Sequence, residues 1–195
     1  LWAHLPEVRR APASLAKLMS ALLVLADGGL DDEVAVTRRA AAARGSRLGL
    51  REGERVLAHG LLAAMLVGSA NDACLALVER KGDAAAFLAR MNAQAAKLEL
   101  RATRFGDPCG FDSDHQYSTA RDLARLAVPA RDLRRVATDG AQPRDGGVVA
   151  ERRARVLGEQ RAPAHLGRAA PHRDYGLGGG GLDRARQHLD LAGRL

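Results

Sequence analysis

Apolar residues recur at helical spacing in four long segments of the chain. The first segment, 14–29, starts at a serine and stops at two glycines. The second, 58–82, holds two helical runs separated by a glycine and the tetrapeptide Ser-Ala-Asn-Asp. The third, 83–100, starts with an aspartate, and the fourth, 118–130, starts with Ser-Thr and stops near a proline. A wide apolar stripe with a polar cap residue at its start is typical of an amphipathic helix packed on a core.

The stretches between these segments read as turns and short pieces of structure. Residues 1–10 are typical of a strand followed by a turn, and residues 36–43 predict a short helix or a loop. Residues 45–56 contain three glycines at turn positions, and residues 103–118 form a turn-rich loop. Helix should therefore dominate the folded part of the chain.

The character of the sequence changes after about Val136. Residues 138–195 contain no lysine, asparagine or phenylalanine and are dense in Gly, Arg, Pro and His. Only 148–157 and 182–192 suggest short helices there. We expect two regions, with residues 1–137 as a folded unit and residues 138–195 as an atypical, weakly structured tail. A shift of reading frame in a GC-rich gene would produce text of this kind.

Composition and charge narrow the class of protein. The 195 residues suffice for one domain or two small lobes, and with 47% apolar but 3% aromatic residues the core must consist mainly of Ala, Leu and Val. The net charge of +7 is scattered among acidic residues, so nucleic-acid binding through the Arg-rich tail is only a minor alternative. No stretch is long and apolar enough for a membrane span, and no signal peptide is visible. The chain reads as incomplete at both ends.

The two cysteines, Cys74 and Cys109, lie far apart in the sequence and show no zinc-ligand spacing. A disulfide between them stays open at this point. Cys74 lies in an apolar run and is expected to be a small buried residue. No metal or other cofactor is expected.

The first candidate for chemistry is the pair Ser14 and Lys17 at the head of the first helix. A lysine three residues after a serine lies on the same helix face. If it is buried, its amine can lose its charge and act as a base toward the serine hydroxyl. The alternative is that Ser14 caps the helix and Lys17 lies at the surface.

The second candidate is Ser69 with Asn71, in the break between two helical runs. There Ser69 could relay a proton and Asn71 could hydrogen-bond a substrate amide, whereas the simpler alternative makes Ser69 a helix cap. The chain has only six serines, three lysines and two asparagines. The probability that both motifs occur in this order by chance is therefore roughly half a percent.

These blocks resemble the D-alanyl-D-alanine carboxypeptidases, the low-molecular-mass penicillin-binding proteins, for which a Ser-x-x-Lys signature is known. The resemblance covers roughly residues 1–137. It rests on the letters PASLAKLM around the first motif, VGSANDACLALVE around the second, and FGDPCGFDSDHQYSTARDLARLA, which is similar to the family's Asn-Pro-x-Gly loop, Tyr-Ser-Thr-Ala and following helix.

The resemblance implies an α+β fold of the β-lactamase/DD-peptidase type, here helix-dominated and with its antiparallel sheet incomplete. It implies that Ser14 forms an acyl-enzyme, Lys17 is its general base, Ser69 joins the proton relay and Asn71 orients the substrate. The reaction would remove the terminal D-Ala from peptidoglycan pentapeptides. Expected partners are peptidoglycan stem peptides and β-lactams, and the expected location is extracytoplasmic.

The sequence departs from the family in one respect that bears on activity. No Lys-Thr-Gly or His-Thr-Gly triplet occurs, so the residues that would bind the substrate carboxylate are unknown. The chain should therefore be catalytically weak or inactive. Alternatives are a non-catalytic fragment or pseudoenzyme, and a serine β-lactamase-like hydrolase. Against the latter, the loop at 103–118 lacks the glutamate that class A β-lactamases would show.

Overall fold

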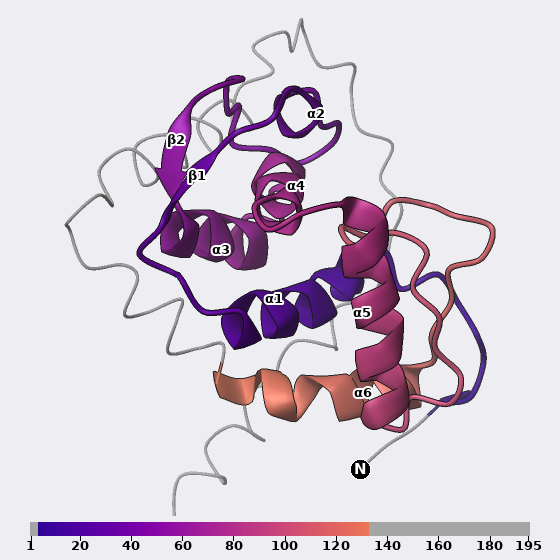
Figure 1. Ribbon diagram of the computed structural model, residues 1–195. Helices are drawn as coiled ribbons and strands as arrows, with labels where there is room; N and C mark the ends of the chain where they lie inside the picture. Colours follow the sequence, from indigo (N-terminus) through magenta and orange to yellow (C-terminus); the bar gives the residue numbers. More distant parts are fainter. Residues whose placement is uncertain (1–3, 133–195) are drawn as a thin grey trace, which may run out of the picture. The chain divides into compact units, whose positions relative to one another are not determined.

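A computed structural model of the chain describes residues 4–132, which are mostly helical (Figure 1). The elements in chain order are η1 (Ala13–Leu15), α1 (Ala16–Ala26), β1 (Glu33–Ala35), α2 (Arg38–Ala41), β2 (Arg55–Leu57), α3 (Ala58–Val67), α4 (Asn71–Glu79), α5 (Ala84–Lys97), α6 (Ala120–Ala127) and η2 (Pro129–Asp132). All four long helical segments expected from the sequence are therefore confirmed, including the break between α3 and α4.

Helix α1 is the centre of the packing. Helices α3, α4, α5 and α6 all contact it, and Figure 1 shows α3 and α4 on one side of α1 and α6 on the other. The buried side chains are mainly Ala, Leu, Val and Met, with two phenylalanines, as the low aromatic content required. Because small side chains let helices approach closely, an alanine-rich core gives α1 several helical neighbours at once.

A two-stranded antiparallel sheet stands beside the helices, as the expected incomplete sheet implied, but the sequence pattern did not locate its strands. Strand β1 pairs with β2 so that Val34 lies opposite Val56. Each strand has three residues, which is too short for its alternation to be recognised in the sequence. The fold class is nevertheless the expected one, a helix-rich α+β arrangement with little sheet.

The strand expected near the chain start is wrong for the residues that the structure describes. Residues 4–7 form bends and turns, residues 8 and 9 are irregular, and Arg10 pairs in an isolated bridge with Ser118. This bridge brings the chain start beside the segment that leads into α6. The proline at position 6 and the turn it favours are compatible with this conformation.

Two of the expected helix caps are confirmed. The Asp83 side chain accepts a hydrogen bond from the Ala85 amide at the start of α5, and the Thr119 side chain accepts one from the Asp122 amide at the start of α6. Such caps satisfy backbone donors that the first helical turn leaves free.

Other expectations lie outside the described residues. They include the division between residues 137 and 138, the atypical tail, and the short helices at 148–157 and 182–192. Within residues 4–132, no helix combines the length and the apolar character that crossing a membrane requires.

Candidate active site

Ser14 lies in the 3-10 turn η1 that leads directly into α1, and it is exposed. It does not cap the helix, because no side-chain cap hydrogen bond is found at the start of η1 or of α1. The capping alternative is therefore wrong for Ser14. The residue before it, Ala13, has φ 48°, in the left-handed region that costs a non-glycine residue about 1–2 kcal/mol. Backbone strain of this kind concentrates at functional sites.

Lys17 follows in the first turn of α1 and is buried, with 3% of its surface exposed. Its Nζ donates hydrogen bonds to Ser14 Oγ at 3.3 Å and to the Cys109 carbonyl at 2.6 Å. The surface-lysine alternative is therefore also wrong. Burial lowers the pKa of Lys17, and the nearby negative charge of Asp107 opposes this by raising it. A lysine whose pKa is lowered is more often neutral at physiological pH and can then accept a proton.

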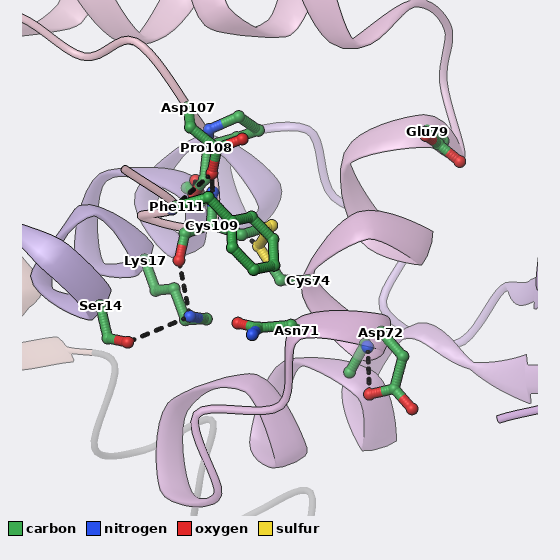
Figure 2. Close-up of a disulfide and its surroundings, with 12 residues drawn as sticks. Ser14, Lys17, Asn71, Asp72, Cys74, Glu79, Asp107, Pro108, Cys109 and Phe111 are labelled. Atoms are coloured by element: carbon green, nitrogen blue, oxygen red, sulfur yellow. Dashed lines mark hydrogen bonds between the residues drawn. A yellow bond between two sulfur atoms is a disulfide. The ribbon is translucent and has the colours of Figure 1, made fainter. Parts of the chain in front are cut away.

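Asn71 is the first residue of α4 and reaches the same place from the other side (Figure 2). Its amide nitrogen Nδ2 donates to the Arg44 carbonyl at 2.7 Å, and its backbone N–H donates to the Ser46 carbonyl at 2.7 Å. With Nδ2 held in this way, the side-chain oxygen of Asn71 points toward the Lys17 amine, as Figure 2 shows. The structure thus brings Ser14, Lys17 and Asn71 together.

Ser69 is not joined to this group by a hydrogen bond among the described residues. It is half-buried, and its backbone is left-handed with φ 54°. It does not cap α4, since Ala70 is the N-cap residue and no side-chain cap bond is present. The capping alternative is therefore wrong for Ser69 as well, and its role in a proton relay stays a prediction.

Asp72, next to Asn71, fixes the loop that holds the Asn71 side chain. Its carboxylate is buried and accepts hydrogen bonds from the backbone N–H groups of residues 48, 49 and 50, and from its neighbour Ala73. Several N–H groups converging on one carboxylate stabilise both the charge and the turn. Nothing in the sequence indicated that Asp72 is buried, and its only visible signal was an acid directly after Asn71 in the second motif.

The segment from Asp107 to Phe111 forms a further wall of the site. Gly110 lies so close to the backbone of the η1 turn that a Cβ on it would clash with the Ala13 carbonyl oxygen. One oxygen of Asp107 accepts from the N–H groups of Cys109 and Phe111 and so shapes the turn. The sequence showed the turn residues here but not that a main-chain carbonyl of this segment binds Lys17.

Cys74 and Cys109 form a disulfide with a Cα–Cα distance of 5.9 Å, which settles the question that the sequence left open. Both residues are buried, as expected for Cys74. The bond joins α4 to the wall segment, and Figure 2 shows it beside Lys17 and Asn71.

A separate pocket of about 350 Å³ lies between the chain start and α6. Its lining residues are His4, Leu5, Val8, Arg10, Ala11, Pro12, Leu15, Ser118, Thr119, Ala120 and Leu123. None of Ser14, Lys17 and Asn71 is among them, so this pocket is not assigned to substrate.

Comparison with known proteins identifies the family of the chain. A family model described as D-alanyl-D-alanine carboxypeptidase matches residues 1–138. The chain belongs to the D-alanyl-D-alanine carboxypeptidase family. Among curated members of the family, DacF of Bacillus subtilis is 35% identical over 125 residues, which cover 61% of this chain and 32% of DacF.

Solved structures of this family are similar in fold as well. The D-alanyl-D-alanine carboxypeptidase DacD from Francisella tularensis superposes with a TM-score of 0.64 at 33% identity, covering 69% of this chain and 35% of that one. A D-alanyl-D-alanine carboxypeptidase from Mycobacterium tuberculosis gives 0.66 at 29% identity, covering 72% and 54%. The chain therefore spans about a third to a half of the family members it matches. Proteins of this family act on peptidoglycan and bind β-lactams.

Proposed function

We propose that this chain is part of a serine-type D-Ala-D-Ala carboxypeptidase that acts on peptidoglycan pentapeptides. It carries the residues that form the acyl-enzyme. The observation that carries the proposal is the buried Lys17 amine. It donates a hydrogen bond to the Ser14 hydroxyl, and the Asn71 side-chain oxygen points toward it. A base with a lowered pKa in contact with an exposed hydroxyl is the arrangement that activates a serine nucleophile.

In the proposed reaction, Ser14 Oγ attacks the carbonyl carbon of the penultimate D-Ala, and its proton passes to the neutral Lys17 amine. The C–N bond to the terminal D-Ala then breaks, and the leaving amine takes up the proton. Asn71 orients the substrate amide, and Ser69 joins the proton relay. Water then attacks the ester on Ser14, which releases the shortened peptide and restores the hydroxyl.

We expect acylation to be slow, because the 195 residues contain no Lys-Thr-Gly or His-Thr-Gly triplet. In the family this triplet binds the substrate carboxylate, and its strand supplies an oxyanion donor. Loss of one oxyanion donor costs about 3–4 kcal/mol of barrier, or a factor of about 10²–10³ in rate. Residues 138–195 remain a proposed separate, atypical tail.

The disulfide supports a location outside the cytoplasm, where peptidoglycan lies. Disulfides persist in oxidising compartments and are rare in reducing ones. The described residues of the site are thus compatible with work in the periplasm or on the cell-wall side of the membrane.

Labelling with a fluorescent penicillin tests the proposed function. The unmodified chain should form a slow covalent adduct, Ser14→Ala should form none, and Ser113→Ala should label like the parent. Equal labelling of Ser14→Ala would refute the assignment of the nucleophile. Release of D-Ala from a Lys-D-Ala-D-Ala peptide then separates turnover from binding. Adduct formation without any D-Ala release would favour the alternative of a non-catalytic member of the family, for which the missing triplet is the specific evidence.

A further inference from the structure

The Cys74–Cys109 disulfide joins the two parts of the structure that approach Lys17 from different sides. Cys74 lies on α4, one helical turn after Asn71, and Cys109 supplies the carbonyl that accepts a hydrogen bond from Lys17 Nζ at 2.6 Å. Figure 2 shows the disulfide next to Cys109 and above Asn71. The bond therefore fixes the position of the Cys109 carbonyl relative to Asn71.

The other attachments of the wall segment run to different elements. The Pro108 carbonyl accepts a hydrogen bond from Ser20 Oγ of α1 at 2.6 Å, and Gln116 binds the Asp107 N–H from within the same loop. Gly110 packs against the η1 turn without a side chain. The Cys74–Cys109 disulfide is the covalent tie between this segment and α4. Without the disulfide, α4 and the segment could separate while each kept its remaining contacts.

We propose that the disulfide is a positioning element of the active site: it holds the Cys109 carbonyl on the Lys17 amine and so keeps that amine at Ser14 and Asn71. The proposal rests on the proposed function for the role of Ser14, but the position of Lys17 can be measured without activity. The disulfide then makes the site sensitive to dithiols. A dithiol such as dithiothreitol gives two electrons and two protons to the S–S bond, which becomes two thiols, while the dithiol closes to its own cyclic disulfide.

Lys17 offers a direct readout because the chain contains only three lysines, at positions 17, 81 and 97. In protein carrying ¹³C-labelled lysine, the three Cε signals can be followed by NMR as the pH is raised. Burial is the largest cause that lowers the pKa of Lys17, and Asp107 is the charged group that acts against it. If the wall segment moves away, water reaches the amine, and the pKa of Lys17 should rise toward the ordinary value of 10.5.

The experiment compares the full chain with Cys74→Ala/Cys109→Ala and with Glu79→Gln. Glu79 ties the other end of α4 to Arg39 and Thr37, far from the disulfide in Figure 2, so its loss is a control for general weakening of α4. The double variant should raise the pKa of Lys17 and slow penicillin labelling roughly ten- to a hundredfold, since small displacements of a catalytic group cost rates of this order. Glu79→Gln should leave the titration of Lys17 unchanged.

If the double variant does not fold, the Lys17 titration of the unmodified chain is compared before and after reduction with dithiothreitol. An unchanged Lys17 titration in the folded double variant, or in the folded reduced chain, would overturn the proposal. Collapse of all three lysine signals to one position on reduction would also overturn it, because the bond would then stabilise the whole domain rather than this position. A shifted Lys17 signal in a chain that no penicillin labels in either state would support the positioning role and refute the proposed function.

Discussion

Replacing Asp72 with asparagine should be the most damaging conservative change in the site. One carboxylate oxygen of Asp72 accepts from the Leu48 N–H at 3.0 Å and the Ala73 N–H at 2.9 Å. The other accepts from the Gly49 N–H at 2.9 Å and the Leu50 N–H at 3.1 Å. Asparagine has the same shape but only one oxygen, and its NH₂ group cannot accept a hydrogen bond. Either orientation of the amide therefore leaves two N–H groups facing a donor.

The magnitude follows from the two lost bonds. A hydrogen bond to a charged group contributes about 1.5–3 kcal/mol net, so the variant should lose about 3–6 kcal/mol of unfolding free energy. That is a large part of the roughly 5–15 kcal/mol by which a domain is stable. The loop that carries the Arg44 and Ser46 carbonyls, which hold Asn71, should loosen at the same time.

Urea unfolding at pH 7, followed by circular dichroism, measures this loss. The matched control is Asp83→Asn, the same chemical change at an exposed helix cap, where asparagine caps as well as aspartate and the free energy should change by less than about 0.5 kcal/mol. A variant already unfolded without urea would agree with the larger figure. Equal urea midpoints for Asp72→Asn and Asp83→Asn would refute the reasoning, since the four converging N–H groups would then contribute nothing specific.

Three further predictions concern Lys17, the segment 107–111 and the end of α1. Burial holds the pKa of Lys17 in the folded chain below its unfolded value of 10.5. The free energy of unfolding should therefore rise with pH between these two pKa values, because the unfolded chain binds more protons there. The urea midpoints of Lys17→Met should not show this rise. Gly110→Ala should lose about 2–4 kcal/mol in urea unfolding, from contact with the Ala13 carbonyl and from its φ of 88°, whereas Gly49→Ala, with φ 75° in open space, should lose only about 1–2 kcal/mol. Arg80→Met should lower the free energy of unfolding by about 2–3 kcal/mol, seen as a lower melting temperature, because the guanidinium donates to three carbonyls at the end of α1. A loss of unfolding free energy below about 0.5 kcal/mol would contradict this.

The helices were predictable because their apolar period runs over many residues and their caps are local. Asp83 and Thr119 act as caps within three residues of themselves, so the sequence alone indicates them. The pairing of β1 with β2 was not predictable, since three residues per strand carry too little alternation and the partners lie 20 to 24 positions apart.

The candidate site was predictable only in part. Ser14, Lys17 and Asn71 stand in recognisable motifs, and their convergence is what the family pattern implied. The contribution of Cys109 was hidden because it acts through its main-chain carbonyl, which every residue type possesses. Its pairing with Cys74 could not be derived either, because two cysteines 35 residues apart say nothing about their distance in space.

The contact between Lys17 and the Cys109 carbonyl joins positions 92 apart in the chain, and the bridge between Arg10 and Ser118 spans still more. Contacts of such sequence separation form late in folding, since chain entropy must be spent before they stabilise anything. Helices α1, α3 and α4 can assemble from neighbouring sequence before then, with the Lys17 amine still lacking its carbonyl partner. Ser14 and Lys17 are neighbours in one turn, but the Lys17 amine gains its Cys109 partner only when these long-range contacts form, and we expect acylation by penicillin to report that step.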